Sequence, residues 1–182
     1  MSVSPDHYSP PQTSAPASTA ALLTKPGVWT LVSRTAATFG VGNLGKRVTG
    51  TIPITSARIE VAGGVPSVTA ALDIAGIDTG NARRDKDLRK PALLDLDRHP
   101  ELHFRSERIV ASDEGWTVLG QLTVKDTTRG ITLTADADAQ PDGSVRVRLT
   151  GWLDRRDYGV KAPRFLIGAI VDIQVDVTFV RS

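Results

Sequence analysis

Apolar and polar residues alternate along most of the chain. The clearest run lies near the C-terminal end, where apolar side chains occupy every second position from Val171 to Phe179 and the positions between them are polar. A period of two is typical of a β-strand that has one face in a core and the other face in water. This segment is therefore predicted to be a half-buried strand.

The same alternation recurs in other segments, and turn-forming residues such as Gly63-Gly64 and Asp113-Glu114-Gly115 separate several of them. One-sided antiparallel strands in such numbers must either close on themselves or stack as two sheets. The sequence thus indicates an all-β fold. Strands are predicted near residues 29–32, 37–41, 47–54, 68–74, 102–109, 116–124, 131–135, 145–153 and 171–179.

One segment, at about residues 82–96, departs from the period of two and is predicted to be helical. Asn81 is a suitable N-cap, and Arg84 and Leu88 follow at helical spacing. Pro91 should end the helix, because proline has no backbone N–H, and a second short turn is expected around Leu93. A helical segment within a series of strands is expected to lie near a barrel end, as a candidate lid.

The first 24 residues differ in composition from the rest. Residues 1–24 are rich in Pro, Ser, Ala and Thr and carry almost no charge. Such a segment buries too little apolar surface to offset its loss of conformational entropy, so a disordered N-terminal tail is expected, which contains His7 and Tyr8. Residues 27–182 are expected to form the barrel domain, and a partner for the tail is left open.

Composition excludes several classes of site. The chain has 182 residues, no cysteine and a formal net charge of +2, so disulfides, thiol nucleophiles and zinc–thiolate centres are absent. Basic and acidic residues are interspersed, which does not predict a nucleic-acid partner. No apolar run approaches the roughly 18–20 residues of a membrane span, and no secretory signal is evident. A cytoplasmic location is expected, with a periplasmic or extracellular one as the alternative.

Candidate catalytic groups are few. His99 and His103 are four residues apart, but Pro100 disfavours a helix there, so no metal site is predicted. No G-x-S-x-G motif is present, and no catalytic residue is assigned. An acid/base enzyme that uses loop carboxylates is the least favoured alternative.

Two Arg-Arg-Asp clusters are harder to explain as ordinary surface. Arg83-Arg84-Asp85 follows one predicted strand, and Arg155-Arg156-Asp157 follows another. Arginine presents a rigid fork of donors to carboxylates or backbone carbonyls. The clusters are predicted to anchor loops, and a contact with the polar head of a ligand is left open. The residues assigned to these roles are Asn81, Arg84, Asp85, Arg156 and Asp157.

The order of several short motifs carries a family resemblance over about residues 28–180. They include Asn81-x-x-Arg84-Asp85-x-x-Leu88-Arg89, Gly120-Gln-Leu-Thr-Val124 and Arg156-Asp-Tyr-Gly159. In these the sequence resembles the YceI-like family, bacterial lipocalin-like barrels associated with polyisoprenoid lipids. Family members often have Phe in place of Leu94 and Tyr158, and many carry a secretory signal. The resemblance implies an eight-stranded antiparallel lipocalin-like barrel.

The interior of such a barrel either fills with side chains or holds one small ligand. Many of the predicted inward residues are of modest size, which favours an apolar cavity. The expected function is non-catalytic binding, storage or transport of a long apolar lipid, for which the resemblance implies a polyisoprenoid or an isoprenoid quinone. No other cofactor is expected, and a homodimer is left open. An interaction module with a side-chain-filled core is the main alternative, favoured by a cavity below about 300 Å³. The predicted ligand lining consists of Phe39, Ile52, Ile54, Val68, Ala70, Leu72, Phe104, Val118, Leu122, Leu133, Leu149, Ile173, Val175 and Val177.

Overall fold

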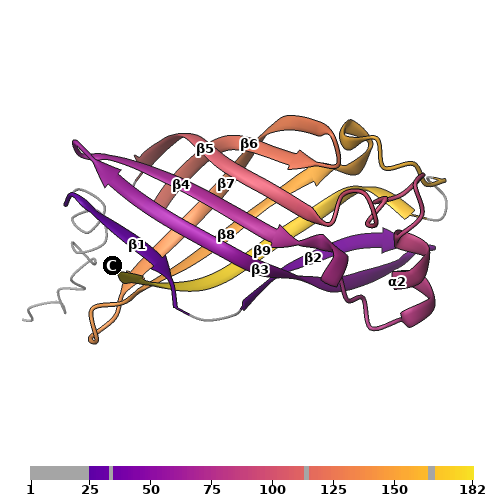
Figure 1. The fold of residues 1–182 in the computed structure, drawn as a ribbon, viewed down its shortest axis with the longest axis horizontal. Helices are drawn as coiled ribbons and strands as arrows, with labels where there is room; N and C mark the ends of the chain where they lie inside the picture. Colours follow the sequence, from indigo (N-terminus) through magenta and orange to yellow (C-terminus); the bar gives the residue numbers. More distant parts are fainter. Residues whose placement is uncertain (1–24, 33–34, 113–114, 164–166) are drawn as a thin grey trace, which may run out of the picture.

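Nine antiparallel strands form one continuous sheet that curls round on itself (Figure 1). The structure is a computed structural model that describes residues 25–32, 35–112, 115–163 and 167–182. The predicted tail and the turn residues Asp113 and Glu114 lie outside this range. The strands are β1 (Gly27–Leu31), β2 (Thr35–Asn43), β3 (Lys46–Ala62), β4 (Val65–Asp73), β5 (Glu101–Ser112), β6 (Gly115–Val124), β7 (Thr127–Ala139), β8 (Val145–Asp154) and β9 (Ile167–Arg181).

Two of the nine strands share a single place in the barrel. β1 and β2 each pair with β3 on one side and with β9 on the other, at different levels along these long strands. Trp29 in β1 lies opposite Ile59, whereas Phe39 in β2 lies opposite Gly50. β4 pairs with both β3 and β5, so the sheet closes. The predicted eight-stranded antiparallel barrel is confirmed, with its first position divided between β1 and β2.

β3 extends well past the end predicted for it. The sequence pattern suggested an end at residue 54, but the strand continues to Ala62. The register shifts between Ile54 and Ser56, and this bulge moves the inward side chains from the even positions to the odd ones. A strict period of two misses such a strand, because the alternation restarts in the opposite phase.

The predicted helical segment is only partly helical. α2 (Ala82–Leu88) begins as expected, with the side chain of Asn81 accepting a hydrogen bond of 3.0 Å from the backbone N–H of Arg84. Turns replace the helix from residue 89 onward, around Pro91 and Asp95, whose φ is +51°. Two short 3₁₀ segments, η1 (Ile74–Gly76) and η2 (Arg155–Tyr158), follow β4 and β8. No helix in the described part of the chain is long and apolar enough to cross a bilayer.

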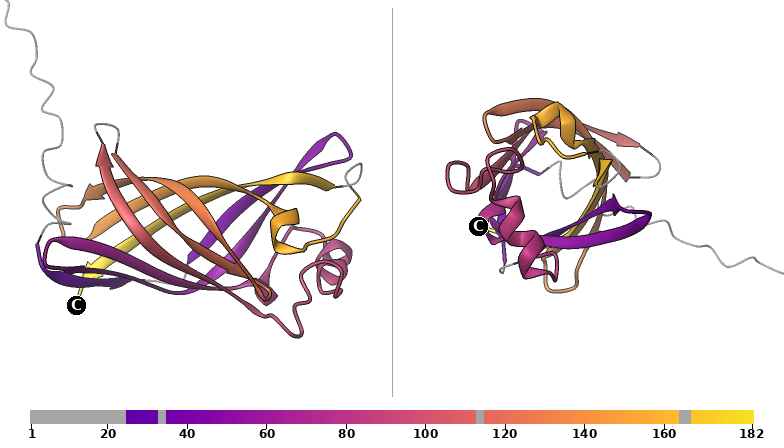
Figure 2. Two further views of the ribbon diagram at one scale, coloured as in Figure 1. Left: turned by 90° about the horizontal axis from the view of Figure 1, so that it is seen from above. Right: turned by 90° about the vertical axis from the view of Figure 1, so that its right-hand side faces the viewer.

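Apolar side chains pack into two separate clusters, one toward each end of the barrel. At the end opposite α2, the cluster includes Trp29, Val61 and Phe179, and the guanidinium of Arg181 lies 5.6 Å from the Trp29 ring centre. At the other end, Leu94 and Leu96 belong to a cluster that also contains Leu102, Leu122 and Tyr158. Figure 2 shows α2 and the turns after it crossing this end. Both ends of the interior are thus packed.

Replacing Trp29 by Ala should destabilise the barrel strongly. The side chain is 4% exposed, and truncation of a buried tryptophan costs about 3–5 kcal/mol. The measurement is the free energy of unfolding in urea, followed by circular dichroism. Val180→Ala is the control, because Val180 is 39% exposed and its loss should change stability by less than about 0.5 kcal/mol. If both variants lost the same free energy of unfolding, the inference that Trp29 packs in the apolar cluster at this end would be contradicted.

Candidate functional site

An elongated cavity of about 270 Å³ runs through the barrel. Strands from all round the barrel contribute to its wall, and its surface is apolar throughout. Its volume lies just under the roughly 300 Å³ at which pockets for drug-sized ligands begin. A wall without polar atoms offers no hydrogen bonds to water, so the space suits hydrocarbon rather than solvent.

The structure brings the predicted lining residues together. All of them border the cavity except Val118, which is 4% exposed but does not reach the cavity wall. Sequence reasoning missed the lining that comes from outside the strands, because turns carry no period that marks an inward face. It also left out part of the lining that the strands supply. The missed residues outside the strands are Ile74, Ile77, Leu88, Leu93, Leu94, Arg155, Tyr158, Val160 and Ala162. Those in the strands are Ala37, Thr38, Val41, Ala57, Leu102, Val124, Ile131, Leu153, Ile167, Val171 and Phe179.

Two glycines in the wall make room for aromatic rings. A Cβ placed on Gly50 would lie 2.5 Å from the ring of Phe39, and one placed on Gly120 would lie 2.7 Å from the ring of Phe104. Each ring therefore lies over a position that has no side chain. The rings therefore lie close to the wall and extend less far into the cavity than they would if residues 50 and 120 had side chains.

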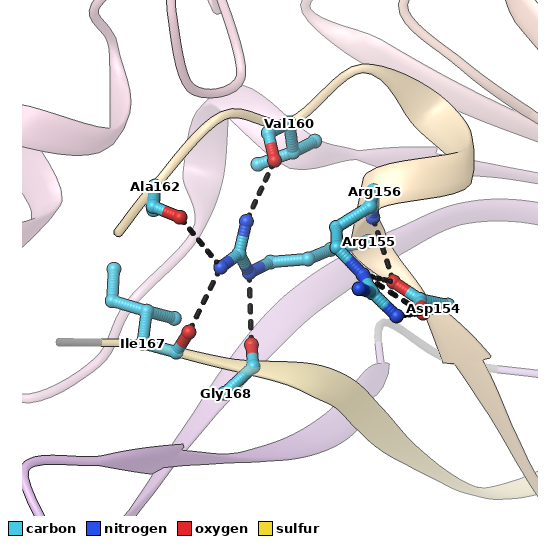
Figure 3. A network of polar contacts seen from close by, with 7 residues as sticks. All are labelled: Asp154, Arg155, Arg156, Val160, Ala162, Ile167 and Gly168. Atoms are coloured by element: carbon cyan, nitrogen blue, oxygen red, sulfur yellow. Dashed lines mark hydrogen bonds and ion pairs between the residues drawn. The ribbon is translucent and has the colours of Figure 1, made fainter. Parts of the chain in front are cut away.

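Arg155 anchors the segment that follows η2. Its guanidinium donates to four backbone carbonyls at 2.7–2.9 Å, and the residue is only 6% exposed (Figure 3). Burial lowers the pKa of this guanidinium. One side chain thus joins the chain before residue 164 to the start of β9. The four acceptors are the carbonyls of Val160, Ala162, Ile167 and Gly168.

In this cluster the sequence assigned a loop-anchoring or head-group role to Arg156 and Asp157, and it did not single out Arg155. Arg156 is exposed and pairs with Asp154, whose carboxylate also accepts the backbone N–H of Arg156 at 3.0 Å. These two hydrogen bonds hold the pKa of Asp154 at about 2. Asp157 is exposed and does not border the cavity. Arg155 and Arg156 were indistinguishable in the sequence, because only the backbone of η2 decides which one faces the interior.

The first Arg-Arg-Asp cluster anchors its own loop, as predicted. Nε of Arg84 donates to the Thr79 hydroxyl at 2.8 Å, and this hydroxyl donates to the Asp85 carboxylate at 2.5 Å. Asp85 also accepts the backbone N–H of Thr79 at 3.1 Å. Arg84 and Asp85 therefore fix the start of α2 against the end of the preceding segment. Neither they nor Asn81 border the cavity.

The segments from α2 and from η2 that cover the cavity are joined to each other and to the barrel. The amino group of Lys125 donates to the carbonyls of Pro91 and Leu93 at 3.0 and 3.2 Å. The backbone N–H of Lys161 donates to the carbonyl of Ala92 at 2.8 Å. Hydrogen bonds to its backbone carbonyls thus add to the packing of Leu94 and Leu96 in holding this cover of the cavity.

A hollow of about 440 Å³ lies on the surface beside this cover. Arg155, Val160 and Ala162 border both the hollow and the cavity, whereas Arg156 and Lys161 border the hollow alone. The interior is thus apolar and the adjoining surface is basic. No group of three or more metal-ligating side chains occurs in the described residues.

The two histidines outside the tail lie in different surroundings. His99 is 3.4 Å from the carboxylate of Asp126, and His103 is 3.6 Å from that of Glu101. Neither borders the cavity. Of the described residues that border the cavity, Thr38, Arg155 and Tyr158 carry polar side-chain atoms, but the surface exposed to the cavity is apolar.

A closed antiparallel barrel with an apolar interior defines the chain as a lipocalin-like protein. Within that class, residues 29–179 match the family model described as "YceI-like domain". The chain belongs to this family, which confirms the resemblance seen in the sequence motifs.

Relatives and solved structures agree with this fold. The chain is 29% identical over 111 residues to a UPF0312 protein of Serratia proteamaculans and 32% identical over 89 residues to one of Yersinia enterocolitica. These alignments span 58% and 46% of both partners, so the chain matches about half the length of these curated relatives.

Two solved structures resemble the barrel. The crystal structure of Burkholderia cenocepacia BcnA has a TM-score of 0.69 at 17% identity and covers 79% of this chain and 94% of its own. A structure described as a polyisoprenoid binding domain from Saccharophagus degradans, implicated in plant cell wall breakdown, has a TM-score of 0.66 at 12% identity. It covers 87% of this chain and all of its own. At these identities the likeness shows the fold.

Replacing Arg155 by Met should loosen the segment after η2 and destabilise the protein. Methionine keeps much of the stem volume but leaves four carbonyls without their donor, at about 1–3 kcal/mol for each that stays buried. Because some of them will reach water, a total loss of roughly 3 kcal/mol is expected. Urea unfolding and protease cleavage within residues 160–163 measure the two effects. Arg156→Met is the control and should leave the free energy of unfolding near neutral pH close to that of the wild type, because its ion pair with Asp154 is exposed to solvent.

Replacing Asp154 by Asn should change how stability depends on acid. The pKa of Asp154 is about 2 in the folded chain and about 3.9 for an unfolded aspartate. Its ionised form therefore stabilises the fold fully above about pH 4, and this contribution is lost as the pH falls toward 2. The difference in thermal midpoint between wild type and Asp154→Asn should shrink over that range. In an Arg156→Met background the shrinkage should be smaller, and an unchanged pH dependence would contradict the assigned cause.

Proposed function

We propose that this protein binds the hydrocarbon part of an isoprenoid lipid inside its barrel, without catalysis, for storage or transport. The apolar cavity, packed at both ends and lined by the predicted inward residues, is the observation that carries the proposal. The resemblance to the Saccharophagus degradans structure, which is described as a polyisoprenoid binding domain, supports it. Burial of each methylene contributes about 0.8 kcal/mol before ordering costs, so affinity needs no specific polar contact.

The cavity volume sets the length of chain that fits. An apolar cavity of about 150 Å³ holds benzene. By the same ratio, 270 Å³ accommodates roughly ten carbons, or two isoprene units. A longer polyisoprenoid or quinone tail then requires either expansion of the barrel or extension past the cover.

The hollow beside the cover is the place proposed for a polar head group. Arg156 and Lys161 border it; Arg156 lies in η2, and Lys161 lies in the segment after η2 that Arg155 anchors. A phosphate or a quinone oxygen at this point would meet a positive charge directly outside the apolar cavity. The contact proposed between Arg156 and a head group depends on the position of Arg156 at the border of this hollow.

The cover is proposed to act as the gate. Leu88, Leu93 and Leu94 border the cavity from this segment, and the hydrogen bonds from Lys125 and Lys161 hold it in place. Opening requires few hydrogen bonds to break, whereas opening the wall would break a continuous strand ladder. Exchange of ligand therefore proceeds at the α2 end.

An interaction module with a filled core is the second candidate, because 270 Å³ lies below the lower bound for drug-sized sites. The two candidates differ in whether the interior accepts a chain. Uptake of lipid distinguishes them directly.

The test is a titration of the full chain with isoprenoid alcohols of increasing length. Geraniol and farnesol should bind, and Leu149→Trp should lower their affinity at least about tenfold by filling the cavity. Isothermal calorimetry measures the binding, and mass spectrometry of solvent extracts identifies lipid carried through purification.

The matched control is Thr150→Trp, because Thr150 is the next residue on β8 and is exposed on the outside. Its affinity should equal that of the wild type. A wild-type barrel that carries no lipid and binds no isoprenoid would overturn the proposal in favour of the filled-core module.

A further inference from the structure

A bulky apolar residue occupies the tip of the hairpin between β2 and β3. Leu44 and Gly45 are the two residues of this turn, with φ values of +47° and +75°. Positive φ at both positions is typical of a type I′ turn, which favours Asn, Asp and Gly. Leucine there is strained and, at 66% exposure, gains little from packing. An exposed leucine with positive φ therefore indicates that position 44 is kept apolar for a reason other than stability.

Two other large apolar side chains lie on the outside of the neighbouring strands. Trp152 on β8 is 62% exposed and Ile170 on β9 is 45% exposed. Trp152 pairs with Asp172 and Asp154 pairs with Ile170, so the two apolar side chains are diagonal neighbours on the outer face. β9 in turn pairs with β2 just before its hairpin. We call Leu44, Trp152 and Ile170 the outer apolar face.

This face lies at the same end of the barrel as the cover. Figure 1 places the end of β2, the start of β9 and α2 together at one end of the molecule. Figure 2 shows the hairpin of β2 and β3 projecting beyond the barrel wall there. The tip of this hairpin, which carries Leu44, therefore projects from the barrel at this end.

The charges on this face suit an anionic surface. Its two carboxylates are both paired, Asp172 with Arg47 at 2.7 Å and Asp154 with Arg156. Lys46 directly follows the tip, is exposed, and makes no ion pair within the described residues. The face thus carries no uncompensated negative charge and has a lysine beside its most protruding side chain.

We propose that the outer apolar face docks the barrel on the surface of a lipid bilayer that contains anionic head groups. Tryptophan favours the interface between water and hydrocarbon, and an apolar tip beside a lysine combines insertion with electrostatic attraction. A second copy of the chain fits less well, since a stable dimer buries about 1,200–2,000 Å² around a packed apolar centre. The three apolar side chains lie apart, on a projecting tip and on a curved wall. They can insert into a bilayer in this arrangement, but they do not form the packed apolar centre of a dimer interface. Docking places the cover and the hollow next to the membrane.

The experiment measures co-sedimentation of the full chain with vesicles of phosphatidylcholine, with and without phosphatidylglycerol. The double variant Leu44→Asn, Trp152→Thr should bind at least about tenfold more weakly to both. Asparagine suits the turn and threonine suits an outer strand position, so the fold is preserved. Lys46→Gln should weaken binding about fivefold, and only to the vesicles that contain phosphatidylglycerol.

The matched control changes two exposed apolar residues at the opposite end. Val65 is 68% exposed and Val180 is 39% exposed, and Val65→Asn with Val180→Thr should sediment like the wild type. Two results overturn the proposal: a wild-type chain that stays in solution, and a Leu44→Asn, Trp152→Thr variant that sediments unchanged. A dimer that disappears in Trp152→Thr, together with absent sedimentation, would assign the face to a second copy. Titration with farnesol in vesicle-free buffer tests the cavity separately, because none of these residues borders it.

Discussion

Closure of the sheet is the constraint on which the other features of this protein depend. The pairing of β1 and β2 with both β3 and β9 joins the first strands of the chain to the last. Because every described strand then has a neighbour on each side, the inner face surrounds an apolar interior and the described strands leave no long unpaired edge. The bulges in β3 and β5 bend the sheet while keeping its apolar side inward. β3 and β9 are long strands. The two shorter strands β1 and β2 pair with different parts of them, in place of one long partner strand.

The two ends of the barrel differ in how they are sealed. Opposite α2, large side chains such as Trp29 and Phe179 fill the interior directly. At the α2 end, non-strand segments cover it, and side-chain donors such as Arg155 and Lys125 hold their carbonyls. Leu94 and Leu96 of these segments also pack into the apolar cluster at this end, so packing as well as hydrogen bonding holds them. One end is thus filled by strand side chains, and the other is closed by segments that lie outside the strands.

Much of the barrel could be predicted from the sequence, because the alternation of residues reports directly which face is buried. The same rule supplied part of the cavity lining: of the predicted residues only Val118 does not border the cavity, but unpredicted strand residues such as Ala57, Leu102 and Ile131 border it too. The rule stops where the backbone leaves the strands. It could not reveal the restart of phase in β3, the contribution of Leu93 and Tyr158 to the wall, or the choice of Arg155 over Arg156 as anchor. Each of these depends on the path of the backbone in a turn or bulge, which neighbouring strands decide.

The glycines beneath Phe39 and Phe104 set the width of the barrel from within its wall. A methyl group at position 50 or 120 would lie less than 3.0 Å from the ring above it and also from a backbone carbonyl, that of Asp78 or of Arg105. Either substitution would therefore have to displace the ring and shift the neighbouring backbone together. The bore at these two levels is thus fixed by residues that do not border the cavity, and it resists change by a single substitution.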